Sequence, residues 1–490
     1  MEFQDLPPSF QLQFRKLSAT LRDMIKNLRM SVDIYSLGQS SNIIAEVIQG
    51  LIGEETFNTT DACTLILVDR TLDLVAASVH SENLFDKLLC GEETFCGLQI
   101  FPHGNSQKLK MMRALFDKSP KDSLSELQRI LLEDVQKGTN VKNQSSSLDR
   151  LSSTLESLQT RDVAFTLENG ELLEFVSSVL NKLKSSKSET KQAELSSVEK
   201  LILYECDSNQ EELLNSIISL LKKEGEKFNV EDILRLTSII YSVVTPECTF
   251  DGENELKDMI CKKIIQEANE SIGHKNGFLV RMLKPDTLKQ LESEKTQNKN
   301  DPKDEDEEDW DNWNEEFSDE EDINSVQEYL REELDYHFKC LNAIKKQREQ
   351  LQTLRKLAGN EHTFIFENPG VFGETETPYR SLCMQLAYVI GQSEPCNDLV
   401  HSTSLLGSIS NTFGFMLQKK TKLIRDESST IIIFVVGGIT CGEIADIRNM
   451  IEGNIKEKGI QSPYHGKDVL IGSTSMITSP HFIPYQLFTK

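Results

Sequence analysis

Two aspartates directly after a short apolar run are the first candidates for chemistry in this sequence. The run from Cys63 to Val68, CTLILV, predicts a strand buried on both faces, and Asp69, Arg70 and Asp73 follow it. Paired carboxylates in such a place are typical of acid–base or Mg²⁺ chemistry. The alternative, which we favour, is that the carboxylates bond backbone amides or the arginine and that all three residues are structural.

A glycine turn near the other end of the chain offers a second candidate. Thr430–Val436 predicts another fully buried strand, Gly437 and Gly438 turn the chain, and Thr440 with Glu443 has the pattern of a capping box that opens a helix. The amides of such a turn can hold an anion. Because no glycine-rich nucleotide fingerprint accompanies it, we interpret these four residues as a structural turn and cap.

Signals for a metal or a nucleophile are weak. His337 and Cys340 lie one helical turn apart, but no second pair accompanies them, so we predict no zinc site. The nucleophile elbow, the zinc-protease helix and the P-loop are all absent. The ten cysteines contain no C-x-x-C pair, and nothing selects one of them and one of the eight histidines as a catalytic pair. We therefore predict no catalytic residue, no metal and no cofactor.

The two tryptophans of the chain lie in its most acidic stretch. Residues 301–322 contain 14 acidic residues and one lysine, which predicts a disordered tether over 285–322. Trp310, Trp313 and Phe317 gain nothing for the fold there, so we interpret them as a linear motif that binds a partner. The alternative is a helical edge that docks on its own domain. EDWDNWNEEF also resembles the acidic tryptophan motifs that bind the δ subunit of the COP-I coat.

Between the two strand regions the pattern is helical. Asn229 is a good N-cap for a helix with an apolar stripe, and Ile323–Leu357 predicts one long helix that ends near Gly359. This long helix is either the spine of a helical domain or a surface for a partner helix. Val469–Thr474 predicts a last strand, parallel to Thr430–Val436 through a right-handed crossover.

The fold class that follows is α/β, with a partly parallel sheet domain interrupted by a large all-helical insertion. We expect the first part of the sheet domain over residues 1–97 and its second part over 360–490. The insertion covers 98–284 and the long helix 323–359, with the acidic tether over 285–322 between them.

Charge and composition exclude several classes of function. The net charge of −25 and the pI near 4.9 argue against nucleic acid or an anionic membrane as the main partner. The longest apolar run, Ile431 to Ile439, is too short to span a membrane, and the first residues do not form a signal peptide. We therefore expect a cytoplasmic chain with reduced thiols.

Four of these stretches, taken in order, resemble the Sec-one/Munc-eighteen (SM) family of SNARE regulators. They are TLILVDRTLDL at 64–74, FNVEDILRL at 228–236, IIIFVVGGITCGEIADIR at 431–448 and VLIGST at 469–474. TLDLVAASVHSENLFDKLL is most similar to a divergent branch, the Sec-one family domain-containing proteins.

The resemblance implies a non-enzymatic regulator of vesicle-mediated transport and membrane fusion, peripheral at ER and Golgi membranes through its partners. Those partners would be syntaxin-type SNAREs or the SNARE bundle and tether subunits. The acidic tryptophan motif adds the COP-I δ subunit as an expected partner, and the net charge argues against nucleic acid. In the family an N-terminal α/β domain precedes the strand at 64–68, whereas about 60 residues precede it here. The sequence therefore predicts that this domain is missing, through an incomplete sequence or through loss of the syntaxin clasp.

Overall fold

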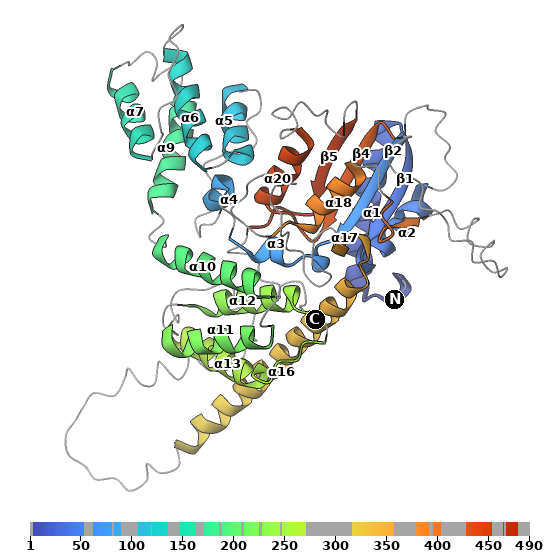
Figure 1. Ribbon diagram of the computed structural model, residues 1–490, viewed down its shortest axis with the longest axis vertical. Helices are drawn as coiled ribbons and strands as arrows, with labels where there is room; N and C mark the ends of the chain where they lie inside the picture. Colours follow the sequence, from blue (N-terminus) through green and yellow to red (C-terminus); the bar gives the residue numbers. More distant parts are fainter. Residues whose placement is uncertain are drawn as a thin grey trace, which may run out of the picture. The chain divides into compact units, whose positions relative to one another are not determined.

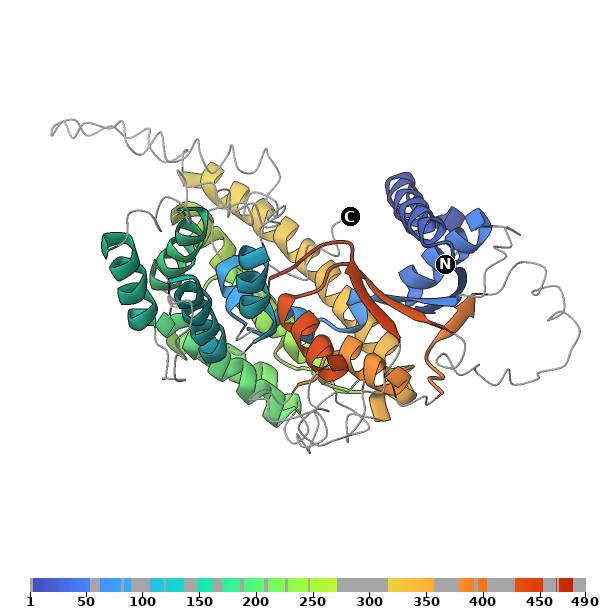
Figure 2. The ribbon, with the colours of Figure 1, turned by 90° about the horizontal axis from the view of Figure 1, so that it is seen from above.

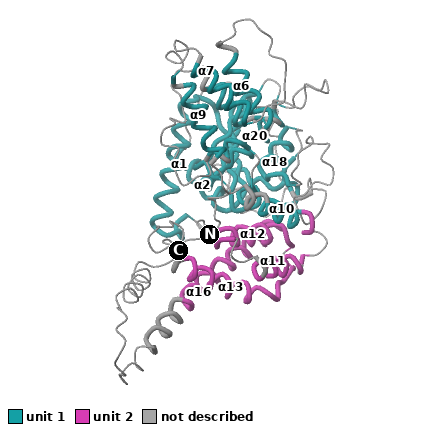
Figure 3. Tube along the Cα trace, turned by 90° about the vertical axis from the view of Figure 1, so that its left-hand side faces the viewer, with its two compact units in different colours: residues 1–203, 350–482 teal, residues 204–349, 483–490 magenta. Residues whose placement is uncertain are grey.

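The structure is a computed structural model of the chain, and it divides into two compact units (Figure 3). Unit 1 comprises Met1–Leu203 and Gln350–Phe482, and unit 2 comprises Tyr204–Glu349 and Ile483–Lys490. The predicted domain boundaries at residues 97, 284, 322 and 359 remain a prediction. The structure describes residues 3–52, 62–80, 83–89, 106–118, 120–135, 148–161, 170–185, 189–206, 210–224, 228–245, 247–270, 316–356, 379–391, 395–402, 428–452, 464 and 467–478.

Unit 1 is built on a five-stranded sheet with the strand order β3-β1-β2-β4-β5 (Figure 1). Neighbouring strands among β1, β2, β4 and β5 run parallel, and β3 pairs antiparallel with β1 at one edge. The strands are β1 (Ser31–Leu37), β2 (Ala62–Asp69), β3 (Val400–Ser402), β4 (Thr430–Val436) and β5 (Asp468–Ser473). The predicted fold class, a partly parallel sheet interrupted by helices, is confirmed.

The three strands expected from the sequence are present, and two further strands were not expected. β1 carries polar residues, among them Asp33 and Ser36, which interrupt the apolar run that marks a buried strand. β3 is three residues long, with Val400 and His401 exposed at the sheet edge. An edge strand needs no apolar pattern, because one side of it faces solvent.

Helices cover both faces of the sheet, as Figure 2 shows for α1 and α2 on one side and α18 and α20 on the other. α1 (Pro8–Leu28) packs against α2 (Gln39–Ile52), which in turn contacts β1 and β2. Alternate strand residues face this side and join one buried cluster with the two helices, including Leu21, Ile25, Ile44, Ile48, Leu65, Leu67 and Ile432. α18 (Leu382–Gly391) and α20 (Cys441–Glu452) contact each other.

Five helices of unit 1 share a second apolar cluster, to which Cys441 at the start of α20 also belongs. They are α4 (Leu84–Leu89), α5 (Ser106–Asp117), α6 (Pro120–Val135), α7 (Leu148–Arg161) and α9 (Gly170–Ser185). α10 (Glu189–Glu205) follows them in the chain. The described residues of unit 1 also form four short helical turns: η1 (Phe3–Asp5), η2 (Arg70–Leu72), α3 (Val75–Ser78) and α17 (Thr353–Lys356).

Unit 2 consists, among the described residues, of α11 (Gln210–Glu224), α12 (Val230–Val243), α13 (Glu253–Glu270) and α16 (Glu316–Glu349). α12 begins where the sequence predicts, because the Asn229 side chain accepts a hydrogen bond from the Asp232 amide at 2.8 Å. Asp232 reaches back to the Asn229 amide at 3.1 Å and completes a capping box. Apart from Glu231 the whole helix is buried, so it is a core helix and not one with a single apolar stripe.

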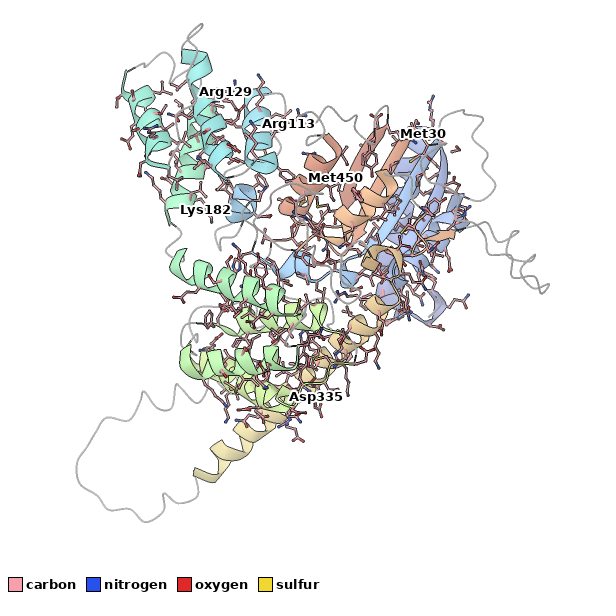
Figure 4. The ribbon with its side chains drawn as sticks, in the orientation of Figure 1. Met30, Arg113, Arg129, Lys182, Asp335 and Met450 are labelled. Atoms are coloured by element: carbon pink, nitrogen blue, oxygen red, sulfur yellow. The ribbon has the colours of Figure 1, made fainter. Side chains whose placement is uncertain are left out.

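Buried lysines hold α16 against its neighbours. Lys257 on α13 donates to Asp335 on α16 at 2.7 Å, and Asp335 is labelled in Figure 4. Lys345 on α16 donates to the carbonyl of Cys248 at 2.8 Å. Burial lowers the pKa of the Lys345 ammonium. These polar contacts favour one register of α16, because a shifted helix would leave Lys345 buried without its acceptor and Lys257 with Glu253 alone.

α16 differs from the long helix expected over 323–357. It begins at Glu316, because acidic residues in its first turns favour the positive end of the helix. It ends at Glu349, and a turn separates it from α17. Residues 316–322, which the sequence assigns to a tether, are therefore helical, and the tether up to residue 315 lies outside the described residues.

Removing the cap of α12 should weaken unit 2. Asn229→Ala is expected to cost about 1 kcal/mol of unfolding free energy, because the amide of Asp232 loses its acceptor. Amide exchange in the first turn of α12 should accelerate by the corresponding factor of roughly five. Asn229→Asp, which keeps an acceptor, is the matched control. Equal exchange rates for both variants would contradict the cap.

Candidate functional site

The residues with the strongest chemical signal lie together at the carboxyl-terminal edge of the parallel strands. Asp69 is the last residue of β2, and Arg70 and Asp73 follow in η2 and its cap. β2 lies between β1 and β4, so the turns that follow those two strands flank it. Exposed fractions of 4%, 1% and 3% for Asp69, Arg70 and Asp73 show that none of the three faces solvent.

Asp69 binds the start of α2. Its carboxylate accepts hydrogen bonds from the Ser40 amide at 2.8 Å, the Ser41 amide at 2.8 Å and the Ser41 hydroxyl at 2.6 Å. Gly38 makes this approach feasible, since its φ is +105° and a Cβ there would lie 2.5 Å from the Asp69 side chain. The carboxylate therefore satisfies the free amides of a helix that follows a different strand.

Arg70 forms a bidentate ion pair with Glu443. One guanidinium nitrogen, Nη2, donates to both carboxylate oxygens at 2.9 Å. Nε donates to the Gly438 carbonyl at 3.0 Å, and Nη1 donates to the Asp73 carbonyl at 2.9 Å. The guanidinium thus donates hydrogen bonds to three segments that meet at this edge.

The glycine turn after β4 fits around this arginine. Gly437 has φ +108°, and a Cβ there would lie 2.8 Å from Cβ of Arg70. Its amide donates to the Thr474 hydroxyl at 2.9 Å. The Gly438 carbonyl is the acceptor for Arg70. The turn therefore works as a close-packing element between β4 and β2.

Asp73 binds the start of α18. One oxygen accepts from the Tyr379 hydroxyl at 2.5 Å and from the Ala76 amide at 3.0 Å, and the other accepts from the Leu382 amide at 2.7 Å. Tyr379 and Leu382 come from the far end of the chain, so this carboxylate joins two distant segments of unit 1.

The start of α20 is capped twice. The Glu443 amide donates to the Thr440 hydroxyl at 3.1 Å, and the Thr440 amide donates to the Glu443 carboxylate at 3.0 Å, as in the expected capping box. Asp86 on α4 adds a second cap, accepting from the amides of Cys441 at 3.1 Å and Gly442 at 3.0 Å. Sequence reasoning missed Asp86, whose only signal is a carboxylate inside an apolar helix.

Burial and pairing decide the charges at this edge. Burial opposes the charge of Arg70, but the carboxylates of Glu443 and Asp73 outweigh it and raise the pKa of the guanidinium. Burial raises the pKa of Glu443, and Arg70 opposes this shift. Burial also raises the pKa of Asp69 against its three hydrogen bonds and that of the Cys383 thiol. A thiol with a raised pKa stays protonated and is therefore a poor nucleophile.

These contacts give the aspartate pair no free face for catalysis. Both carboxylates are buried, both accept three hydrogen bonds from the protein, and each lies on a helix start. An active carboxylate needs access to substrate or water. The geometry supports the structural interpretation of Asp69, Arg70, Asp73, Gly437, Gly438, Thr440 and Glu443, which remains a proposal.

The other predicted sites lie elsewhere. His337 in unit 2 is fully buried, and burial lowers its pKa to about 3, so its ring is neutral. Within the described ranges no three His, Cys, Asp or Glu side chains are grouped to hold a metal ion. Phe317 falls in the first turn of α16, with its side chain outside the described set, and Trp310 and Trp313 lie outside the described residues.

One further buried carboxylate was not expected from the sequence. Glu199 on α10 is fully buried and accepts from the His80 amide at 2.8 Å. Its other oxygen lies 2.6 Å from Nδ1 of the His80 ring. The contact ties α10 to the segment that follows α3. Its signal in the sequence is weak, because Glu199 sits among other charged residues of a helix.

Comparison with known proteins gives the class of protein. A family model described as "Sec1 family" matches residues 121–484, so the chain belongs to the Sec1 family. This is the family that the four ordered motifs indicate, and it consists of non-enzymatic regulators. No curated protein matches the chain.

Solved SM-protein structures are similar to the chain at low identity. The structure of the SM protein Vps45 has 11% identity and a TM-score of 0.46, with 96% of this chain and 66% of that chain covered. Sly1p in complex with an N-terminal peptide of Sed5p has 13% identity and a TM-score of 0.41, with 98% and 69% covered. The chain therefore spans about two thirds of the length of these proteins.

In the part of the chain that the structure describes, every helix is too short or too polar to cross a bilayer.

Breaking the Arg70–Glu443 pair should lower the unfolding free energy strongly, whereas replacing both residues by apolar ones should lower it much less. Arg70→Met leaves Glu443 buried without a counter-ion, so we expect a loss of about 3–5 kcal/mol in unfolding free energy. Arg70→Met with Glu443→Leu removes both charges and should recover much of it. Urea unfolding at several pH values measures both effects.

The pH dependence separates a charge effect from a packing effect. Without Arg70, the largest influence that lowers the pKa of Glu443 is lost. Burial and the Asp73 carboxylate then raise this pKa further, opposed only by the hydrogen bond from the Thr440 amide. A raised pKa means that stability is present at low pH and is lost as the pH rises through the folded value. The deficit of Arg70→Met should therefore grow from pH 5 to pH 8. Arg22→Met, at the exposed Arg22–Asp23 pair, is the control. A deficit equal at all pH values would contradict the assignment.

Proposed function

We propose that this chain is a non-enzymatic regulator of vesicle-mediated transport and membrane fusion that binds SNAREs. The observation that carries the proposal is the Sec1-family match over residues 121–484. The saturated carboxylates at the sheet edge support a binding protein over an enzyme, since they hold the fold and leave no free acid or base there.

The contact surface for a SNARE helix would lie on unit 2. α16 is 34 residues long, or roughly 50 Å at the usual helical rise. One side of it packs on α12 and α13, and the other side is exposed. We call the exposed side the α16 row: Glu328, Glu332, Lys339, Ala343 and Lys346. Over residues 327–349, whose side chains the structure describes, this exposed side suits a second helix laid along it.

The proposal places the chain at ER and Golgi membranes, where it is peripheral and held by its partners. Tether subunits are its second class of partner. Both statements rest on the resemblance of 71–89 to the divergent branch of the family and on the acidic tryptophan motif, which is similar to motifs of retrograde tethers and coat regulators.

Reversing charge on the α16 row should weaken SNARE binding. We expect Lys339→Glu with Lys346→Glu to bind a purified syntaxin-type cytosolic domain about tenfold more weakly, because both cations leave the contact face. Isothermal titration measures the affinity. Lys222→Glu with Lys262→Glu, at exposed positions of α11 and α13, is the control with equal charge change.

If the wild type and the α16 variant bind every syntaxin-type domain with equal affinity, the proposed location of the surface is wrong. If the wild-type chain binds none of them, the proposed function itself is wrong.

A second candidate function is that of a coat-binding adaptor. The observation that favours it is the placement of both tryptophans of the chain within an acidic run, whose composition predicts no apolar core. On this proposal Trp310, Trp313 and Phe317 fill apolar pockets, and the carboxylates speed the encounter with a basic surface of the COP-I δ subunit.

Removing the three aromatic side chains should abolish coat binding. Trp310→Ala, Trp313→Ala and Phe317→Ala together keep the charge of the segment, and we expect purified δ subunit to lose at least about a hundredfold in affinity. The matched control changes Asn312, Asn314 and Ser318 to alanine in the same segment. Fluorescence anisotropy with the full chain measures both. Equal binding by the two triple variants would end this candidate.

A further inference from the structure

α1 is a basic helix in a strongly acidic protein. Residues 8–29 contain five basic side chains and one acidic side chain, while the whole chain carries a net charge of −25. α1 precedes residues 121–484, which match the family model. Its apolar side, with Leu21 and Ile25 buried, packs against α2.

Three of the basic residues repeat at a fixed interval. Arg15, Arg22 and Arg29 are seven residues apart, which places them on one line along the helix with a rise of roughly 10 Å between neighbours. We call them the arginine row. A seven-residue repeat is the interval at which two helices laid side by side meet repeatedly.

Exposure leaves the arginine row available to a partner. Arg15 and Arg29 are exposed, and the Arg22 side chain is 27% exposed. Arg22 pairs with its sequence neighbour Asp23 at 2.6 Å, and Arg15 stacks over the Phe3 ring at 5.2 Å. Both contacts are at the surface, where such pairs contribute little and exchange readily.

The backbone at Arg29 is a second, independent observation. Arg29 caps the end of α1 with φ 55° and ψ 34°, and it is the one described residue other than glycine with a positive φ. Glycine, or asparagine, is the favoured residue at such a helix end. An arginine there costs stability, and a costly residue at the third place of a regular row indicates a role in function.

A strip of one large and one small apolar side chain runs beside the arginine row. Leu12 is 55% exposed, and Ala19 follows it seven residues later with partial exposure. A long apolar side chain next to a small one gives a partner helix a place to pack, and the arginine row borders this strip.

We propose that the arginine row of α1 docks an acidic α-helix of a partner protein, one whose carboxylates repeat every seven residues. Carboxylates at that interval meet Arg15, Arg22 and Arg29 together when the two helices run side by side. The matching spacing and charge favour a helix over a lipid surface, which has no fixed spacing. Only Phe10, Leu12 and Leu28 of α1 are large exposed apolar residues, and the net charge of the chain repels an anionic membrane.

A pair of synthetic helices tests the spacing. One peptide of about four heptads carries one Glu per heptad on a single line, with leucine and alanine beside it. The control peptide has the same composition, with its Glu residues distributed around the helix. Binding to the full chain is measured by fluorescence anisotropy at low and high salt. We expect the in-register peptide to bind at least about tenfold more tightly and to weaken in high salt.

Variants of the row test its residues. Arg15→Glu with Arg22→Glu should abolish the preference for the in-register peptide, whereas Lys110→Glu with Lys262→Glu, at exposed positions of α5 and α13, should keep it. Arg29→Gly separates function from stability. It should weaken peptide binding several-fold while the midpoint of thermal unfolding stays the same or rises, because glycine suits the positive φ.

Three results would overturn the proposal. The first is equal binding of both peptides, and the second is no binding of either peptide. The third is that the full chain binds vesicles of phosphatidylcholine and phosphatidylserine instead of the peptides, and that Arg15→Glu with Arg22→Glu abolishes this vesicle binding. None of these results bears on SNARE binding through the α16 row, so the two proposals fail separately.

Discussion

A single buried arginine is the constraint on which unit 1 depends. A guanidinium that is 1% exposed must find a counter-ion and acceptors within the protein, because an unpaired buried charge costs several kcal/mol. Arg70 finds them in Glu443, in the Gly438 carbonyl and in the Asp73 carbonyl. Each acceptor requires a particular position of β4, of its turn or of α20. One side chain therefore links β2 to β4, to its turn and to the start of α20, which Thr440 and Asp86 also cap.

The same edge of a parallel sheet is where α/β proteins commonly bind ligands, since helix starts converge there and favour negative charge. In this chain its own carboxylates occupy that position. Asp69 lies on the start of α2, Asp73 on the start of α18, and Asp86 on the start of α20. The arrangement uses the electrostatics of a ligand site to join segments that are distant in sequence, which suits a scaffold in a family of non-enzymatic regulators.

The sequence predicts the parts of this fold that have a local signal. β4, its glycine turn and the capping box of Thr440 with Glu443 follow from an apolar run, a turn and a spacing of three residues. The cap at Asn229 follows in the same way. β3 and the partners of Asp69 do not follow from the sequence, because a three-residue edge strand has no pattern and Ser41 lies 28 residues before that aspartate. Asp86 and Glu199 were missed for the same reason: their acceptor role is visible only once distant segments are packed together.

The ion pair also sets the order of events during synthesis. Arg70 and Glu443 are 373 residues apart, so β1 and β2 leave the ribosome long before β4 exists. At the usual rate of translation the interval is roughly 20–75 s. Throughout it, one edge of β2 has no neighbouring strand and Arg70 has no counter-ion. The nascent chain therefore carries an apolar strand edge that is open to wrong pairing until β4, at residues 430–436, has been made.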